Sequence, residues 1–102
     1  MDAMTNPTVH HITAKIRLLS EARGGRAEPV RGGEFTGIIA ARGQHFSYRC
    51  HMPPGGLAPG VTATVDIEFM FPELALPFFK VLDEFTLWEG VTIGHGRVVK
   101  LP

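Results

Sequence analysis

The sequence lacks the features on which several classes of protein depend. Its 102 residues include one cysteine, Cys50, so neither an intrachain disulfide nor a cysteine-based metal site can form. No apolar run approaches the roughly 20 residues that a membrane helix requires. The first residues lack the basic start and apolar core of a signal peptide. We therefore expect a cytoplasmic protein with no membrane-spanning segment.

Net charge is also lacking. Ten basic and ten acidic residues cancel, so the chain as a whole is not an obvious ligand for polyanions. The two halves of the chain differ in their charge, however. Residues 15–50 hold seven basic and three acidic residues, a balance of +4, whereas residues 51–102 hold three basic and six acidic residues, a balance of −3. The first half either presents a basic face or is a solvated surface that the second half neutralises, which is the more common role of such runs.

Alternation of apolar and polar residues predicts strands over much of the chain. It is found in residues 9–20, in 44–52 and most clearly in 61–71, whose inward residues we expect to be Val61, Ala63, Val65, Ile67, Phe69 and Phe71. A chain of this length is sufficient for one domain with one modest core. We expect a disordered tail at residues 1–8 and a single domain at residues 9–102.

Glycine and proline divide the predicted strands. The segments at residues 20–34 and 53–60 predict connections, and Arg42-Gly43 and Glu89-Gly90 predict turns. Residues 73–84 predict either a helical turn or an apolar loop that plugs one end of the fold, and Pro77 argues against a continuous helix.

The stretch at residues 85–100, FTLWEGVTIGHGRVVK, predicts a closing hairpin. Phe85 and Leu87 point inward in this pattern, and Trp88 points outward or is partly covered. Glycines on a strand, here Gly94 and Gly96, allow a bulge, tight coiling or close approach of another backbone. About six strands at this spacing predict an all-β fold, either an antiparallel barrel or a sandwich.

No residue pattern is typical of a metal site or a nucleophile. Two adjacent histidines, His10 and His11, point to opposite faces of a strand. His45 and His51 share a face but lie roughly 20 Å apart at the usual rise of a strand. Cys50 lies on the apolar face of its strand, where a free cysteine usually acts as a small hydrophobe.

Paired carboxylates are present without a feature that would separate their pKa values for acid–base catalysis. They are Asp66 with Glu68, and Asp83 with Glu84. The glycines near residue 95 do not open a helix, and no phosphate-binding loop of the GxxxxGK[ST] type is present. We expect no enzyme activity, no cofactor, no metal and no bound nucleotide.

Three segments resemble the C-terminal β-barrel domain of elongation factor Tu and related translational GTPases. The first strand leads into a Gly-Gly-Arg loop and a proline, here Gly24–Arg26 and Pro29. A Pro-Gly turn leads into the alternating strand VTATVDIEFMFP, and the chain closes with FTLWEG and VTIGHGRVV. The resemblance covers about residues 9–101.

This resemblance implies a six-stranded, antiparallel, closed β-barrel without catalytic residues of its own. In the family, this barrel contributes to binding aminoacyl-tRNA and an exchange factor. Matching positions are Arg26 and Pro29 in the loop and Thr92, Ile93 and Gly94 in the last strand. The chain departs from the family at residues 34–38, where the family has a Tyr-Arg-Pro-Gln-Phe run, and in a last turn that is one residue shorter and lacks an arginine.

Two functions follow from these features. The first is a protein-interaction or regulatory module with an apolar docking surface made by Trp88, Met70 and Leu74. The alternative is RNA binding linked to translation, through an arginine-rich surface with these candidate residues: Arg23, Arg26, Arg31, Arg42, Thr92 and Gly94. We favour an unidentified protein partner, because the net charge is zero and basic positions of the family are missing.

Overall fold

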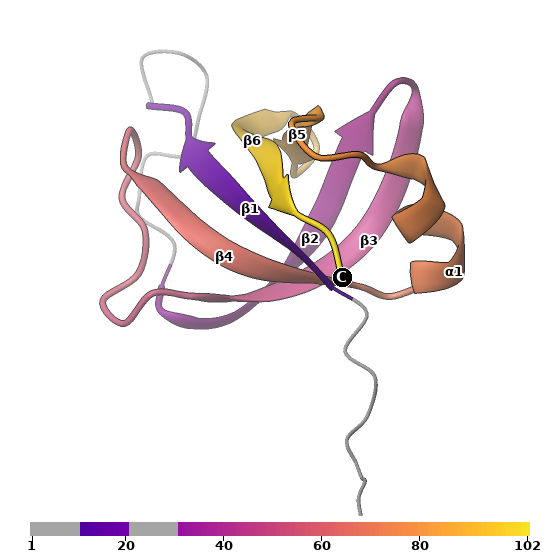
Figure 1. The fold of residues 1–102 in the computed structure, drawn as a ribbon. Helices are drawn as coiled ribbons and strands as arrows, with labels where there is room; N and C mark the ends of the chain where they lie inside the picture. The colour runs from indigo at the N-terminus through magenta and orange to yellow at the C-terminus, as the bar shows by residue number, and fades with distance from the viewer. Residues whose placement is uncertain (1–10, 21–30) are drawn as a thin grey trace, which may run out of the picture.

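The computed structural model describes residues 11–20 and 31–102, which form a closed six-stranded antiparallel β-barrel (Figure 1). The predicted tail and the Gly-Gly-Arg loop, with Arg23, Arg26 and Pro29, lie outside the described residues. The predicted closed barrel is confirmed. Its strands are β1 (His11–Leu18), β2 (Gly33–Ala41), β3 (Gln44–Met52), β4 (Thr62–Phe69), β5 (Glu84–Trp88) and β6 (Thr92–Lys100).

The order of strands around the barrel is β1-β4-β3-β2-β5-β6. The β5–β6 hairpin supplies the closing strand, as predicted, because β6 pairs with β1 from Leu18↔Gly94 to Thr13↔Lys100. Both residues of the predicted turn between β2 and β3 have positive φ, 45° at Arg42 and 80° at Gly43. Positive φ at both central residues is the requirement of the two-residue turn whose twist matches a hairpin.

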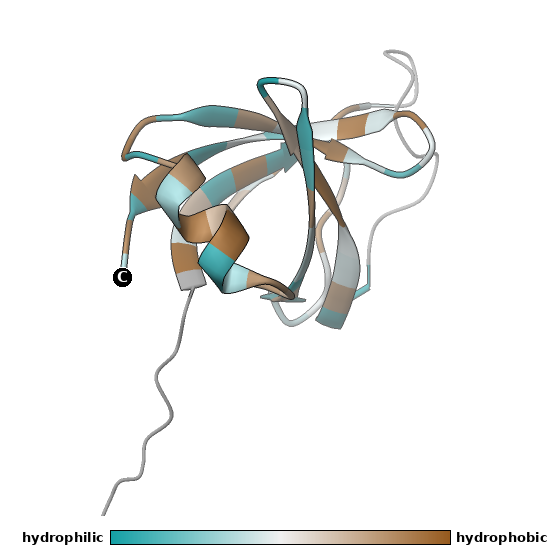
Figure 2. Cartoon of the chain, turned by 90° about the vertical axis from the view of Figure 1, so that its right-hand side faces the viewer, coloured by the Kyte–Doolittle hydropathy of each residue, from teal (hydrophilic) through white to brown (hydrophobic). Residues whose placement is uncertain are grey.

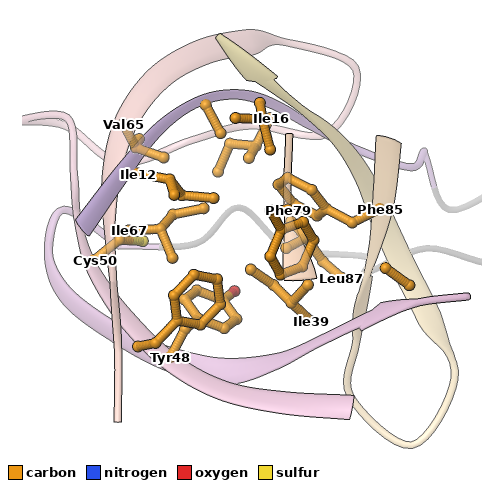
Figure 3. Close-up of a cluster of buried hydrophobic side chains, with 14 of the residues drawn as sticks. Ile12, Ile16, Ile39, Tyr48, Cys50, Val65, Ile67, Phe79, Phe85 and Leu87 are labelled. Atoms are coloured by element: carbon orange, nitrogen blue, oxygen red, sulfur yellow. The ribbon is translucent and has the colours of Figure 1, made fainter. Parts of the chain in front are cut away.

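The core fills the interior of the barrel (Figure 3). Alternate residues of each strand point inward, so the buried set includes Ile12, Ile39, Tyr48 and Ile67. The described residues contain no buried charged or polar residue in this core. The hydrophobic effect, at about 25 cal/mol per Å² of buried apolar surface, is therefore the main force that holds these strands together.

The predicted inward positions at both ends of the 61–71 pattern are wrong. Val61 is 50% exposed and Phe71 is 61% exposed. Alternation applies only within β4, which ends at Phe69, and the chain then turns into α1 (Pro72–Ala75). Pro72 lies in the first turn of α1, where its missing N–H removes no helical hydrogen bond.

Residues 72–79 combine the two predicted alternatives for this segment. The helix α1 is followed by a 3₁₀ helix, η2 (Leu76–Phe78), with Pro77 in its first turn. Ala75 and Phe79 are buried against the barrel. The Phe79 ring stacks on Phe69 at 5.5 Å between ring centres and meets Phe85 edge-on at 6.2 Å. The segment is therefore both a helical turn and an apolar plug.

Close approach explains the two glycines of β6. A Cβ on Gly96 would lie 2.3 Å from the Phe85 ring, and one on Gly94 would lie 2.7 Å from the carbonyl oxygen of Arg17. Gly96 and Phe85 are direct cross-strand partners, so the aromatic ring covers the glycine backbone.

Candidate functional site

Three large apolar side chains are exposed where β4 passes into α1. Met70, Phe71 and Leu74 are 51%, 61% and 67% exposed. The Met70 N–H still donates to the carbonyl oxygen of Ser47 at 3.0 Å, while the Phe71 carbonyl accepts from the N–H groups of Leu74 and Ala75. The backbone therefore holds this turn on both sides, and Ala75 takes the buried position of the helix.

A pocket of about 570 Å³ lies beside this turn. Its aromatic lining includes Phe46, which lies 6.0 Å from Phe69 and 5.1 Å from Phe78 between ring centres. The complete lining is Gln44, His45, Phe46, Ser47, Phe69, Phe71, Leu74, Ala75 and Phe78. None of these is an acidic, lysine or arginine residue. Figure 2 shows the short helical segment and its brown, apolar residues on the face of the barrel turned to the viewer.

The candidate docking residues come together only in part. Leu74 lines the pocket, and Met70 is exposed next to a lining residue. Trp88 lies on β5 and reaches the pocket edge through His45, because the two rings stack at 5.9 Å with an angle of 20°. Phe71 lines the pocket but was assigned to the core by its alternation. The proline that follows it was the available signal that the strand ends there.

Arg42 contacts the segment that follows α1, which contributes Phe78 to the pocket. Its Nη1 lies 3.0 Å from Asp83 Oδ2, its Nη2 donates to the Phe78 carbonyl oxygen, and its guanidinium carbon lies 4.1 Å from the centre of the Phe78 ring. The pKa of Asp83 is lowered, first by the hydrogen bond from the Lys80 N–H and then by the one from Arg42. Arg42 therefore connects the β2–β3 turn to the segment that carries Phe78.

The described members of the predicted RNA-binding set do not gather at one place. Arg31 precedes β2 and Arg42 follows it, so they lie at opposite ends of a strand roughly 30 Å long. Thr92 is partly exposed at the start of β6, whereas Gly94 is buried against β1. Arg23 and Arg26 lie outside the described residues.

A polar groove lies where β3 and β4 diverge beyond Cys50. Its lining includes Glu34, Arg49, Asp66 and Glu68. Arg49 binds Glu68 at 2.8 Å and lies 3.9 Å from Glu34, so charges of opposite sign in this groove pair with each other. Burial raises the pKa of the Cys50 thiol to about 11, which keeps it protonated and unreactive at neutral pH.

Within residues 11–20 and 31–102, no group of three histidine, cysteine or acidic residues is placed to hold a metal ion. The same residues form no helix that is long and apolar enough to cross a membrane. No protein-family model matches the chain, and no curated protein matches it.

Proposed function

We propose that this protein is a non-catalytic β-barrel that binds a protein partner in the cytoplasm through the pocket beside α1. One observation carries the proposal: Phe71 and Leu74 are more than half exposed at the mouth of a pocket that is lined by aromatic rings and by no acidic, lysine or arginine residue. The centre of a protein interface is typically depleted of charge and rich in aromatic residues. The partner we infer presents one or two large apolar side chains.

Covering the exposed pocket side chains contributes part of the binding free energy. Complete burial of one Leu or Phe side chain is worth about 1.5–3 kcal/mol. Phe71 and Leu74 are partly exposed, so a partner that covers them gains only the part of this free energy that belongs to their exposed surface. Burial of the partner's own apolar side chain adds a similar amount. Gln44 and Ser47 at the rim offer hydrogen bonds around the apolar centre.

We also propose that the barrel is of the elongation factor Tu C-terminal type. A closed six-stranded antiparallel barrel with a closing β5–β6 hairpin supports this assignment. That barrel type lacks catalytic residues of its own, and we infer the same for this chain. The single cysteine supports a reducing compartment.

The experiment compares the pocket with an equally exposed leucine elsewhere. The chain is used to capture proteins from cell extract, and the captured partner is purified and titrated against wild type, Phe71→Ala, Leu74→Ala and Leu82→Ala. Leu82 is 65% exposed, close to the 67% of Leu74, but does not line the pocket. Because covering only the exposed part of each side chain is worth about 1–2 kcal/mol, we expect the two pocket variants to weaken binding about 5- to 30-fold, and Leu82→Ala to bind as wild type.

Equal binding by all four proteins would refute the pocket as the docking site. A second copy of the chain is the other occupant to test, by sedimentation over a range of concentrations. Concentration-dependent dimers that Leu74→Ala abolishes would show that the pocket binds a second copy of this chain. That result would refute binding of a different protein.

A further inference from the structure

The outer face of β1 and β6 carries positive side chains in adjacent rows. Cross-strand register aligns Lys15 with Arg97, and Arg17 with His95, between β1 and β6. All four residues are exposed. Lys100 follows on β6, opposite Thr13. We refer to Lys15, Arg17, Arg97 and Lys100 as the cationic rows; β4, β1 and β6, which flank and carry them, run side by side in Figure 1.

The neighbouring strands add hydroxyl groups to these rows. On β4, Thr62 pairs with Arg17 and Thr64 pairs with Lys15. On β5, Thr86 pairs with His95. A hollow of about 560 Å³ follows this face and is lined by Lys15, Arg17, Thr62, Glu84, Phe85, His95 and Arg97, among others.

Most of this positive charge has no acidic partner. Glu84 binds Arg97 at 2.5 Å and neutralises it. Lys15, Arg17 and Lys100 form no ion pair with any residue in the described part of the chain. Three unneutralised cations on one face of a chain with zero net charge therefore point to an anionic ligand rather than to stability.

An aromatic residue lies on the outer face of the neighbouring strand β5. Glu84, Thr86 and Trp88 alternate with buried residues along β5, so Trp88 lies on the same outer face, roughly 7 Å along the strand from Thr86. Trp88 is 40% exposed, and His45 stacks against it. Positive groups that follow a phosphate backbone, with an aromatic ring on which bases stack, are the combination that binds single-stranded nucleic acid without sequence preference.

We propose that the outer face of β4, β1, β6 and β5 binds a nucleic-acid single strand. Lys15, Arg17 and Lys100 contact successive phosphates, the threonine hydroxyls hydrogen-bond to the same backbone, and Trp88 stacks on a base. None of its cations lines the protein-docking pocket, and Trp88 touches that pocket only through the lining residue His45. It uses the sheet face instead of the loop arginines that the sequence suggested.

The test measures fluorescence anisotropy of labelled oligo(U) and oligo(dT) with wild-type protein. Each phosphate contact on a single strand contributes about −0.7 to the slope of log K against log salt. Three contacts give a slope of about −2, so affinity falls about 20-fold between roughly 50 and 200 mM salt. The double variant Lys15→Gln/Arg17→Gln is expected to leave a slope of about −0.7. Trp88→Ala is expected to weaken binding about 5- to 150-fold, through loss of one stacked base.

Arg31→Gln is the matched control, because it removes one exposed positive charge away from the cationic rows. It is expected to bind as wild type. Thermal melting verifies that each variant is folded, and Lys15→Gln is expected to melt close to wild type because Lys15 forms no ion pair within the described residues.

Four outcomes would overturn the proposal: no binding at low salt, equal loss of affinity in Arg31→Gln, tighter binding of duplex than of single strand, or equal binding of poly-glutamate, which would indicate an acidic protein. Phe71→Ala and Leu74→Ala are expected to bind the oligonucleotides normally, so failure of this proposal is distinguishable from failure of the docking pocket.

Discussion

The substitution Gly96→Ala adds one methyl group that has two opposing effects on stability. Replacing glycine by alanine stabilises a protein by about 0.4–1 kcal/mol when alanine can adopt the native φ and ψ angles, because the substitution lowers the conformational entropy of the unfolded chain. Gly96 shows no positive φ, so its backbone does accept alanine. The added Cβ, however, would lie 2.3 Å from two ring carbons of Phe85. Such overpacking of a core costs about 1–3 kcal/mol.

The steric cost decides the sign of the effect. Phe85 is 3% exposed and meets the Phe79 ring at 6.2 Å, so its ring has little room to retreat. We expect Gly96→Ala to lower the free energy of unfolding by about 1–2 kcal/mol, the difference between the two effects. For a domain of this size, this corresponds to a fall in melting temperature of roughly 4–16 °C.

The assay is urea unfolding followed by circular dichroism, with Gly96→Ala made in wild type and in Phe85→Leu. Leucine lacks the two ring carbons that clash, so the same substitution is expected to be neutral or stabilising there. Gly94→Ala is the control, because its Cβ meets the backbone oxygen of Arg17 at 2.7 Å and a smaller residue 85 gives it no room. The reasoning is refuted if Gly96→Ala is harmless in wild type, or equally harmful in both backgrounds.

The remaining predictions concern single contacts described above. Arg42→Ala is expected to destabilise the segment around η2, with the cation–π contact to Phe78 alone worth about 0.5–1 kcal/mol, and urea unfolding measures the loss. The pKa of Asp83 is lower in the folded chain than in the unfolded one, so its stabilising effect is complete at neutral pH. That effect disappears as the pH falls from about 4 through the folded pKa, and wild type and Asp83→Asn should therefore differ in urea midpoint at neutral pH and converge in acid. The Cys50 thiol, with its pKa raised to about 11 by burial, is expected to react with a thiol reagent only as urea unfolds the protein, and rapid labelling of the native chain would contradict its placement in the core.

Periodicity predicted the strands because each wall of the barrel is buried on one side only. Val65, Ile67 and Phe69 alternate with exposed residues and are buried as predicted. Phe71 continues the same alternation and is exposed, since a period of two has meaning only while the chain stays in the sheet. The chain has left the strand before Pro72, and the turn that precedes this proline places Phe71 on the surface.

Cross-strand register could not be read from the chain. Lys15 and Arg97 are 82 positions apart, and only the pairing of β1 with β6 makes them neighbours. The aromatic pocket depends in the same way on the meeting of β3 with the segment after β4. The local alternation of apolar and polar residues therefore predicted the strands and several surface residues. It could not predict which residues become neighbours across strands, because that depends on long-range strand pairing.

The pairing of β1 with β6 also determines when the barrel can close. Thr13 and Lys100 are direct partners, and they are separated by 87 residues. At a synthesis rate of about 5–20 residues per second, this distance corresponds to roughly 4–17 s during which β1 has emerged without its closing strand. An unpaired strand edge is a template for aggregation. Lys15 and Arg17 on β1 repel a second copy of the same strand, and we expect this repulsion to oppose such pairing during that interval.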